Sequence, residues 1–122
     1  MSYNPAKSLS AAGDQVCEFN RTSRSVAGDW EFPSHAYEAI GSLLYMVGML
    51  EQAIGQATRP VMHTYEHGRV LIDGNGDADA KVRELLNAQA EAQIAVSALT
   101  AAVGRMHDAT SPMGIDTTGM EF

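Results

Sequence analysis

The sequence is poor in cysteine and in positive charge. Cys17 is the one cysteine among 122 residues, so no disulfide can form within a single chain. Eight Lys and Arg residues stand against fifteen Asp and Glu residues, which gives a formal net charge of −7. The basic residues are scattered and form no stripe that would face a phosphate backbone. We therefore expect neither nucleic acid nor an anionic membrane surface as a partner.

Long apolar runs are missing as well. The longest apolar stretch, residues 43–50, is interrupted by Tyr45 and Gly48. It is much shorter than the roughly 20 residues that span a bilayer. The first fifteen residues lack the apolar core of a secretory signal. We therefore expect a cytoplasmic protein without a membrane partner, and one domain at most at this length.

Small residues recur at a seven-residue spacing in two parts of the sequence, each beside an apolar heptad seam. Three glycines inside one helix cost about 1 kcal/mol each relative to alanine, so their regular spacing indicates a close approach to the backbone. The first set is Gly41, Gly48 and Gly55, beside Ile40, Leu43, Val47, Leu50, Ile54 and Ala57. The second is Ala88, Ala95 and Ala102, beside Val82, Leu85, Gln89, Ala92, Val96, Leu99, Val103 and Met106.

These patterns predict an all-α fold built on two long antiparallel helices, a helical hairpin over residues 34–109. The first helix begins with Ser34 as its N-cap and runs to about Ala57, where Pro60 ends or kinks it. Further turns reach His67, and a loop over residues 68–78 contains a brief extended piece at residues 70–72. The second helix begins at Asp77 or Asp79 and continues to about residue 108.

The flanking segments contribute less to the predicted fold. Residues 1–33 form an N-terminal arm with a short helix starting at Asn4-Pro5, and its apolar positions are Leu9, Ala12, Val16 and Phe19. Trp30 and Phe32 are expected to dock this arm onto the two long helices. Residues 110–122 are predicted to form a flexible C-terminal tail.

The first long helix is apolar over more than half of its circumference, which is more than one partner helix can cover. We therefore predict a homo-oligomer that completes a four-helix or larger bundle with coiled-coil packing. Gln89 in the second seam either fixes the register of that assembly or lies at the edge of the seam. The predicted interface residues are Gly41, Gly48, Gly55, Leu44, Val47, Ile54, Ala88, Ala95 and Ala102.

Residues 63–67 match the pattern His-x-x-Glu-His. On a helix, His63 and His67 share a face, so they suit two zinc ligands with Glu66 as a general base. A third ligand would have to come from Glu38, Glu84 or His107. The alternative interpretation is a polar helix end, where histidines lie near the negative pole of the helix.

Residues 73–84 resemble the calcium loop of an EF-hand. The loop departs from that pattern at Ala78, which replaces a glycine, and at Lys81, which brings a positive charge. The alternative is a Gly- and Asn-rich turn followed by aspartates that cap the next helix. The candidate metal ligands are Asp73, Asn75, Asp77, Asp79 and Glu84, with His63 and His67 as the second candidate set.

The predicted function is non-enzymatic: a small acidic, self-assembling scaffold, adaptor or inhibitor that acts through a protein partner and needs no cofactor. The composition is similar to that of small acidic proteins of phages and mobile elements. Size and helix count resemble the two-helix secretion substrates of actinobacterial type VII systems. However, Trp30 precedes the first long helix and the connecting loop lacks Trp-x-Gly, so membership is not predicted. The alternative function is a helical oligomer that binds a small molecule, calcium or zinc.

Overall fold

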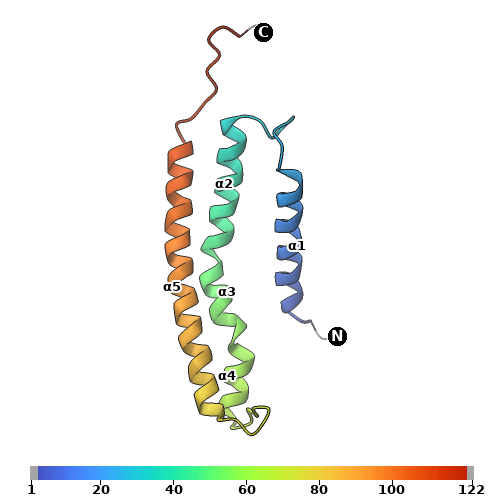
Figure 1. Ribbon diagram of the computed structural model, residues 1–122, viewed down its shortest axis with the longest axis vertical. Helices are drawn as coiled ribbons and strands as arrows, with labels where there is room; N and C mark the ends of the chain where they lie inside the picture. The colour runs from blue at the N-terminus through green and yellow to red at the C-terminus, as the bar shows by residue number, and fades with distance from the viewer. Residues whose placement is uncertain (1–2, 121–122) are drawn as a thin grey trace.

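The computed structural model describes residues 3–120 and folds them into helices joined by short loops (Figure 1). The all-α prediction is confirmed over this range, where the only β-type pairing is an isolated bridge between Ala27 and Trp30. The predicted extended piece at residues 70–72 joins no strand there. Residues 1–2 of the arm and 121–122 of the tail lie outside the described range. The helices are α1 (Ala6–Thr22), α2 (Pro33–Gly48), α3 (Leu50–Ala57), α4 (Arg59–Glu66) and α5 (Ala78–Thr110).

The first long helix of the prediction is divided into three consecutive helices that follow one line in Figure 1. The first break is at Met49, whose backbone N–H donates to Met46 O at 3.2 Å in a tightened turn. Gly48 immediately before it has a low helix propensity. The second break is at Thr58, because the ring of Pro60 clashes with the carbonyl four residues earlier.

The start of α2 is held by a histidine instead of the predicted Ser34 cap. The N-cap position is Phe32, and His35 Nδ1 accepts hydrogen bonds from the backbone N–H groups of Glu31 and Phe32, both at 3.0 Å. Pro33 occupies the first turn, where its missing N–H costs nothing. The prediction of Ser34 as the cap is therefore wrong, because a side chain inside the first turn reaches back to the orphan donors.

Helix α5 lies alongside α2, α3 and α4 over its whole length (Figure 1). Four side-chain hydrogen bonds connect α5 to the line of α2, α3 and α4. From one bond to the next, residue numbers increase along α5 and decrease along the other three helices, so α5 is antiparallel to them. The pairs are Asp79 with Tyr65, Gln89 with Thr58, Gln93 with Glu51 and Thr100 with Val47. The buried apolar side chains in the described range are Val47, Val82 and Val103, at 3%, 5% and 4% exposure.

The predicted seam of α5 is wrong at two positions. Leu99 and Met106 are 46% and 48% exposed. Thr100 and His107 lie on the side of α5 that faces α2. The Thr100 hydroxyl donates to Val47 O, and the His107 ring stacks on Tyr37 with ring centres 4.4 Å apart. A straight helix drifts by about 20° per heptad from a strict seven-residue repeat, so a 33-residue helix turns its later seam positions away from the partner.

Helix α1 stands beside α2, on the side of α2 away from α5 in Figure 1, and contains no buried residue. It is held near its C-terminal end. The Phe19 and Trp30 rings meet edge to face at 5.6 Å, and Trp30 Nε1 donates to Ser23 O at 3.0 Å. Trp30 therefore docks onto the end of α1 and its following turn, and Phe32 remains 40% exposed.

Candidate functional site

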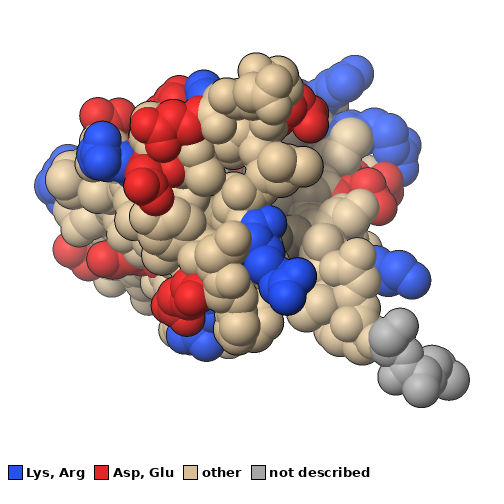
Figure 2. Space-filling view, turned by 90° about the horizontal axis from the view of Figure 1, so that it is seen from below, with Lys and Arg blue, Asp and Glu red and all other residues tan. Residues whose placement is uncertain are grey.

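A groove of about 1190 Å³ lies between α1 and α2. Its apolar lining includes Val16 and Phe19 of α1 together with Leu43 and Met46 of α2. Figure 2 shows the recess end-on, between α1 and the body formed by the other helices. Polar groups are also present along it: Gln15, Asn20, Asp29, His35, Glu38 and Ser42. A groove of this shape between two helices suits a third amphipathic helix.

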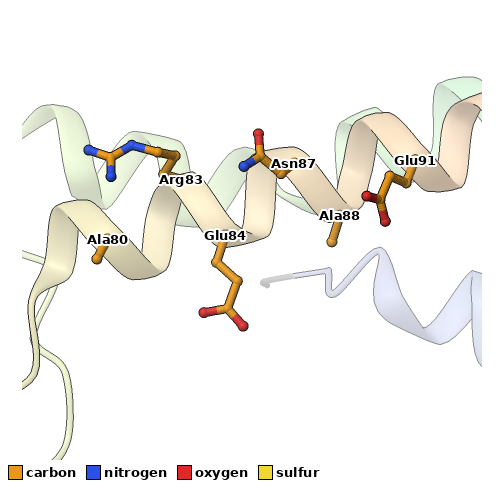
Figure 3. Close-up of a pocket in the computed structure, with 6 residues that line it drawn as sticks. All are labelled: Ala80, Arg83, Glu84, Asn87, Ala88 and Glu91. Carbon is orange, nitrogen blue, oxygen red and sulfur yellow. The ribbon is translucent and has the colours of Figure 1, made fainter.

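A second hollow, of about 400 Å³, lies on the outside of α5. Figure 3 shows that all of its lining residues come from this one helix, with Glu84 and Glu91 on one side and Arg83 and Asn87 on another. Glu84 is paired with Lys81 at 3.0 Å on the exposed surface. Among the described residues, the hollow is lined by α5 alone.

The predicted calcium ligands have other roles in the structure. Asp77 caps α5, because its Oδ1 accepts from the backbone N–H of Asp79 at 2.9 Å and of Ala80 at 3.3 Å. Asp79 Oδ1 accepts from the Tyr65 hydroxyl at 2.6 Å. Asn75 has φ 62°, the left-handed conformation that a tight turn requires. Over residues 3–120 no three His, Cys, Asp or Glu side chains are grouped for a metal, so calcium binding stays a hypothesis.

The hydrogen bond between Tyr65 and Asp79 ties α4 to α5. It raises the pKa of the Tyr65 phenol above its ordinary value of 10.0, because the nearby carboxylate accepts the phenolic proton and disfavours a second negative charge. The folded phenol therefore holds its proton more tightly than the unfolded one. The contribution of this bond to stability is complete below pH 10 and is lost as the pH rises through the folded pKa.

The His-x-x-Glu-His pattern falls on α4 and its C-cap. The His63 and His67 rings are 4.6 Å apart, and His67 Nδ1 donates to His63 O at 2.7 Å. The candidate third ligands have other neighbours. His107 stacks on Tyr37, Glu84 pairs with Lys81, and Glu38 lies along the groove. The structure thus brings two histidines together without a third ligand from the described residues, and zinc binding stays a hypothesis.

The glycines of the first small-residue set do not all have a neighbour within the chain. A Cβ atom on Gly41 would lie 3.2 Å from His107 Nε2, and one on Gly55 would lie 3.1 Å from Gln93 Nε2. Both glycines therefore allow α5 to approach closely within the chain. A Cβ atom on Gly48 would meet nothing within 4 Å. Contact at Gly48 requires a second chain.

The remaining predicted interface residues divide between the core and the surface. Val47 is buried, Leu44 and Ile54 are half-buried, and Leu44 lies against Gly104. Ala102 is half-buried, whereas Ala88 and Ala95 are exposed. Gln89 also makes a contact within the chain, because its Oε1 accepts from the Thr58 hydroxyl at 2.6 Å.

Sequence reasoning missed the two features that organise this surface. The groove depends on how α1 is placed beside α2. The apolar stripe of α1 predicts that another surface covers this helix, but it does not identify that surface. His107 follows Val103 by four residues, so a 3.6-residue period would have placed it on the α2-facing side. The heptad reading selected Met106 instead.

Searches against family models, curated proteins and solved structures give no match to this sequence. Among the described residues no helix is both long enough and apolar enough to cross a membrane.

Asp77 offers a direct test of the two interpretations of the Asp-rich loop. Replacing Asp77 with alanine removes the side-chain acceptor of two orphan N–H groups and should cost about 1 kcal/mol of stability. Asp77→Asn should be nearly neutral, since asparagine caps well. Thermal denaturation with and without millimolar calcium measures both variants. Equal losses in the two conditions are expected from capping, and a loss seen only with calcium would show that Asp77 is a ligand.

Proposed function

We propose that this protein is a non-enzymatic helical scaffold or adaptor that self-associates through its exposed apolar surface. Its accessible surface is the observation that carries the proposal. The chain exposes 9619 Å², whereas a compact monomer of 13.0 kDa exposes about 6,300 Å². The excess is about 3,300 Å² per chain. Obligate dimers bury roughly 1,000–2,500 Å² per chain, so the excess is as large as such an interface.

The composition of that surface supports the same proposal. Leu43 on α2, Leu99 on α5 and Phe19 on α1 are between 39% and 48% exposed, and Ile94 on α5 is 72% exposed. Single exposed apolar residues are ordinary, but apolar residues exposed along three neighbouring helices are typical of an interaction surface. A chain with only three buried apolar side chains in its described range also has little core of its own. Association would supply the missing burial.

Light scattering coupled to size exclusion tests this proposal. At micromolar concentration we expect at least twice the chain mass of 13.0 kDa. Leu43→Arg should lower the mass towards that of one chain, because a charge then lines the apolar groove, while circular dichroism stays helical. Tyr45→Arg is the matched control on the same helix, at a side chain that is 72% exposed, and should keep the wild-type mass. A monomeric wild type at this concentration would contradict self-association.

A further inference from the structure

Helix α1 carries a second pattern beside its apolar stripe. Ala6, Ser10, Gly13 and Cys17 follow one another at spacings of four, three and four residues, so they lie along one side of the helix. All four are exposed, and a Cβ atom on Gly13 would meet nothing within 4 Å. This row of small residues borders the stripe that lines the groove, because Leu9 and Val16 are each next to members of both rows on the helix surface.

We propose that the partner in self-association is the α1 helix of a second copy of this chain, lying antiparallel to α1 along the open side of the groove. This inference rests on the proposed function and adds the surface and the orientation. Around a two-fold axis each copy presents the same helix to the other, so the contact is made twice. Helices α1 and α2 of both copies then form the four-helix core, with α5 of each copy outside α2.

The spacing of the small residues favours the antiparallel orientation. The order four, three, four reads the same in both directions along the chain. An antiparallel pair therefore sets Ala6 opposite Cys17 of the second copy, and Ser10 opposite Gly13 of the second copy. Each level combines two small side chains, which lets the two backbones approach closely, as glycine and alanine do at tight helix contacts.

The charges on α1 favour the same orientation. Lys7 is the only charged residue in the first half of the helix, and Asp14 and Glu18 lie in the second half. In the antiparallel register Lys7 faces the level between Asp14 and Glu18 of the second copy. A parallel pair would set Lys7 against Lys7 and acidic residues against acidic residues, which is destabilising. Glu18 is paired with Arg21 of its own helix at 2.6 Å, so Asp14 is the main acidic partner that Lys7 of the second copy would meet.

The side chains that this contact would cover are apolar and half-exposed. Leu9 is 55% exposed, Val16 38% and Leu43 39%. Val16 and Leu43 line the groove of about 1190 Å³ between α1 and α2, and Trp30 packs on the C-terminal end of α1 at that groove. A second α1 laid over the open side would remove these residues from water without moving either wall. The alternative is that α1 closes onto α2 of its own chain and fills the groove without a second copy. The experiment below distinguishes this closure from pairing with a second copy.

The native Cys17 makes the test a disulfide experiment on the full chain. Ala6→Cys places a second thiol where the antiparallel register brings Cys17 of the other copy. Within one chain, residues 6 and 17 are eleven positions apart, or about 16 Å along a helix, whereas a disulfide needs Cα atoms within about 7 Å. Ala6 is exposed at the first position of α1, so a cysteine there fits without repacking. After mild oxidation we expect most of the Ala6→Cys protein to run as a reducible covalent dimer.

Three matched proteins complete the design. The wild type has only Cys17, and the double variant Ala6→Cys, Cys17→Ser has a thiol only at position 6. In the antiparallel register, position 17 does not lie opposite position 17 of the second copy, and position 6 does not lie opposite position 6. Ala11→Cys keeps Cys17 and places the new thiol on the opposite side of α1. All three should remain uncrosslinked. Equal crosslinking of Ala11→Cys would mean random collision and would overturn the inference.

The outcomes also separate this inference from the proposed function. A wild type that is dimeric by light scattering, together with an Ala6→Cys protein that does not crosslink, would reject the α1 pairing and leave self-association intact. A monomeric wild type would reject both. Closure of α1 onto its own α2 would give no crosslinked product in any variant.

Discussion

Val47→Asp is expected to lower the free energy of unfolding by about 3–5 kcal/mol, whereas Tyr45→Asp is expected to be almost neutral. Val47 is 3% exposed and packs where α2 meets α5, next to the Thr100 hydroxyl that donates to its carbonyl. An aspartate there would be a buried charge with no cation nearby. A buried charge without a partner costs about 3–5 kcal/mol, a large part of the roughly 5–15 kcal/mol that stabilises a folded domain.

Tyr45 is the matched control because it lies two residues away on the same helix and is 72% exposed. Urea denaturation followed by circular dichroism should show a much lower midpoint for Val47→Asp and a midpoint close to wild type for Tyr45→Asp. The experiment should be done at several protein concentrations, since association adds to apparent stability. Equal midpoints for the two variants would contradict the placement of Val47 in the contact between α2 and α5.

Gly41→Leu is expected to destabilise the fold by about 1–3 kcal/mol, and Gly48→Leu is expected to be neutral or slightly stabilising. The difference follows from their surroundings. A Cβ atom on Gly41 would already be 3.2 Å from His107 Nε2, so a leucine must displace the ring that stacks on Tyr37. A leucine on Gly48 enters open space in this chain and improves helix propensity.

Thermal denaturation of the two glycine variants at high and low protein concentration measures this difference. Gly41→Leu should lower the melting temperature at every concentration, because the clash lies within one chain. A Gly48→Leu variant that loses stability only at high concentration would place a second copy against Gly48, as the regular glycine spacing predicts. A harmless Gly41→Leu would show that α2 and α5 do not approach each other at this level.

The sequence by itself determined the elements of the fold that depend on local chemistry. Asp77 caps α5 because its carboxylate is one residue ahead of the helical run and reaches two free N–H groups. Pro60 interrupts the first long helix because any proline does so from within. The all-α class follows from apolar spacing alone. Each of these properties depends on residues within about one helical turn of one another.

Only the tertiary structure decided which faces meet. Thr100 and His107, and not Leu99 and Met106, face α2, because a straight helix drifts from the heptad repeat and the partner fixes where the contact ends. Gly41 and Gly48 lie seven residues apart on the same helix but do not share a neighbour, since His107 of α5 reaches the position of Gly41 and no side chain reaches that of Gly48. The groove beside α1 arises because Trp30 holds that helix near one end only. Distances between helices are set by side chains far apart in the chain, so a local pattern does not determine them.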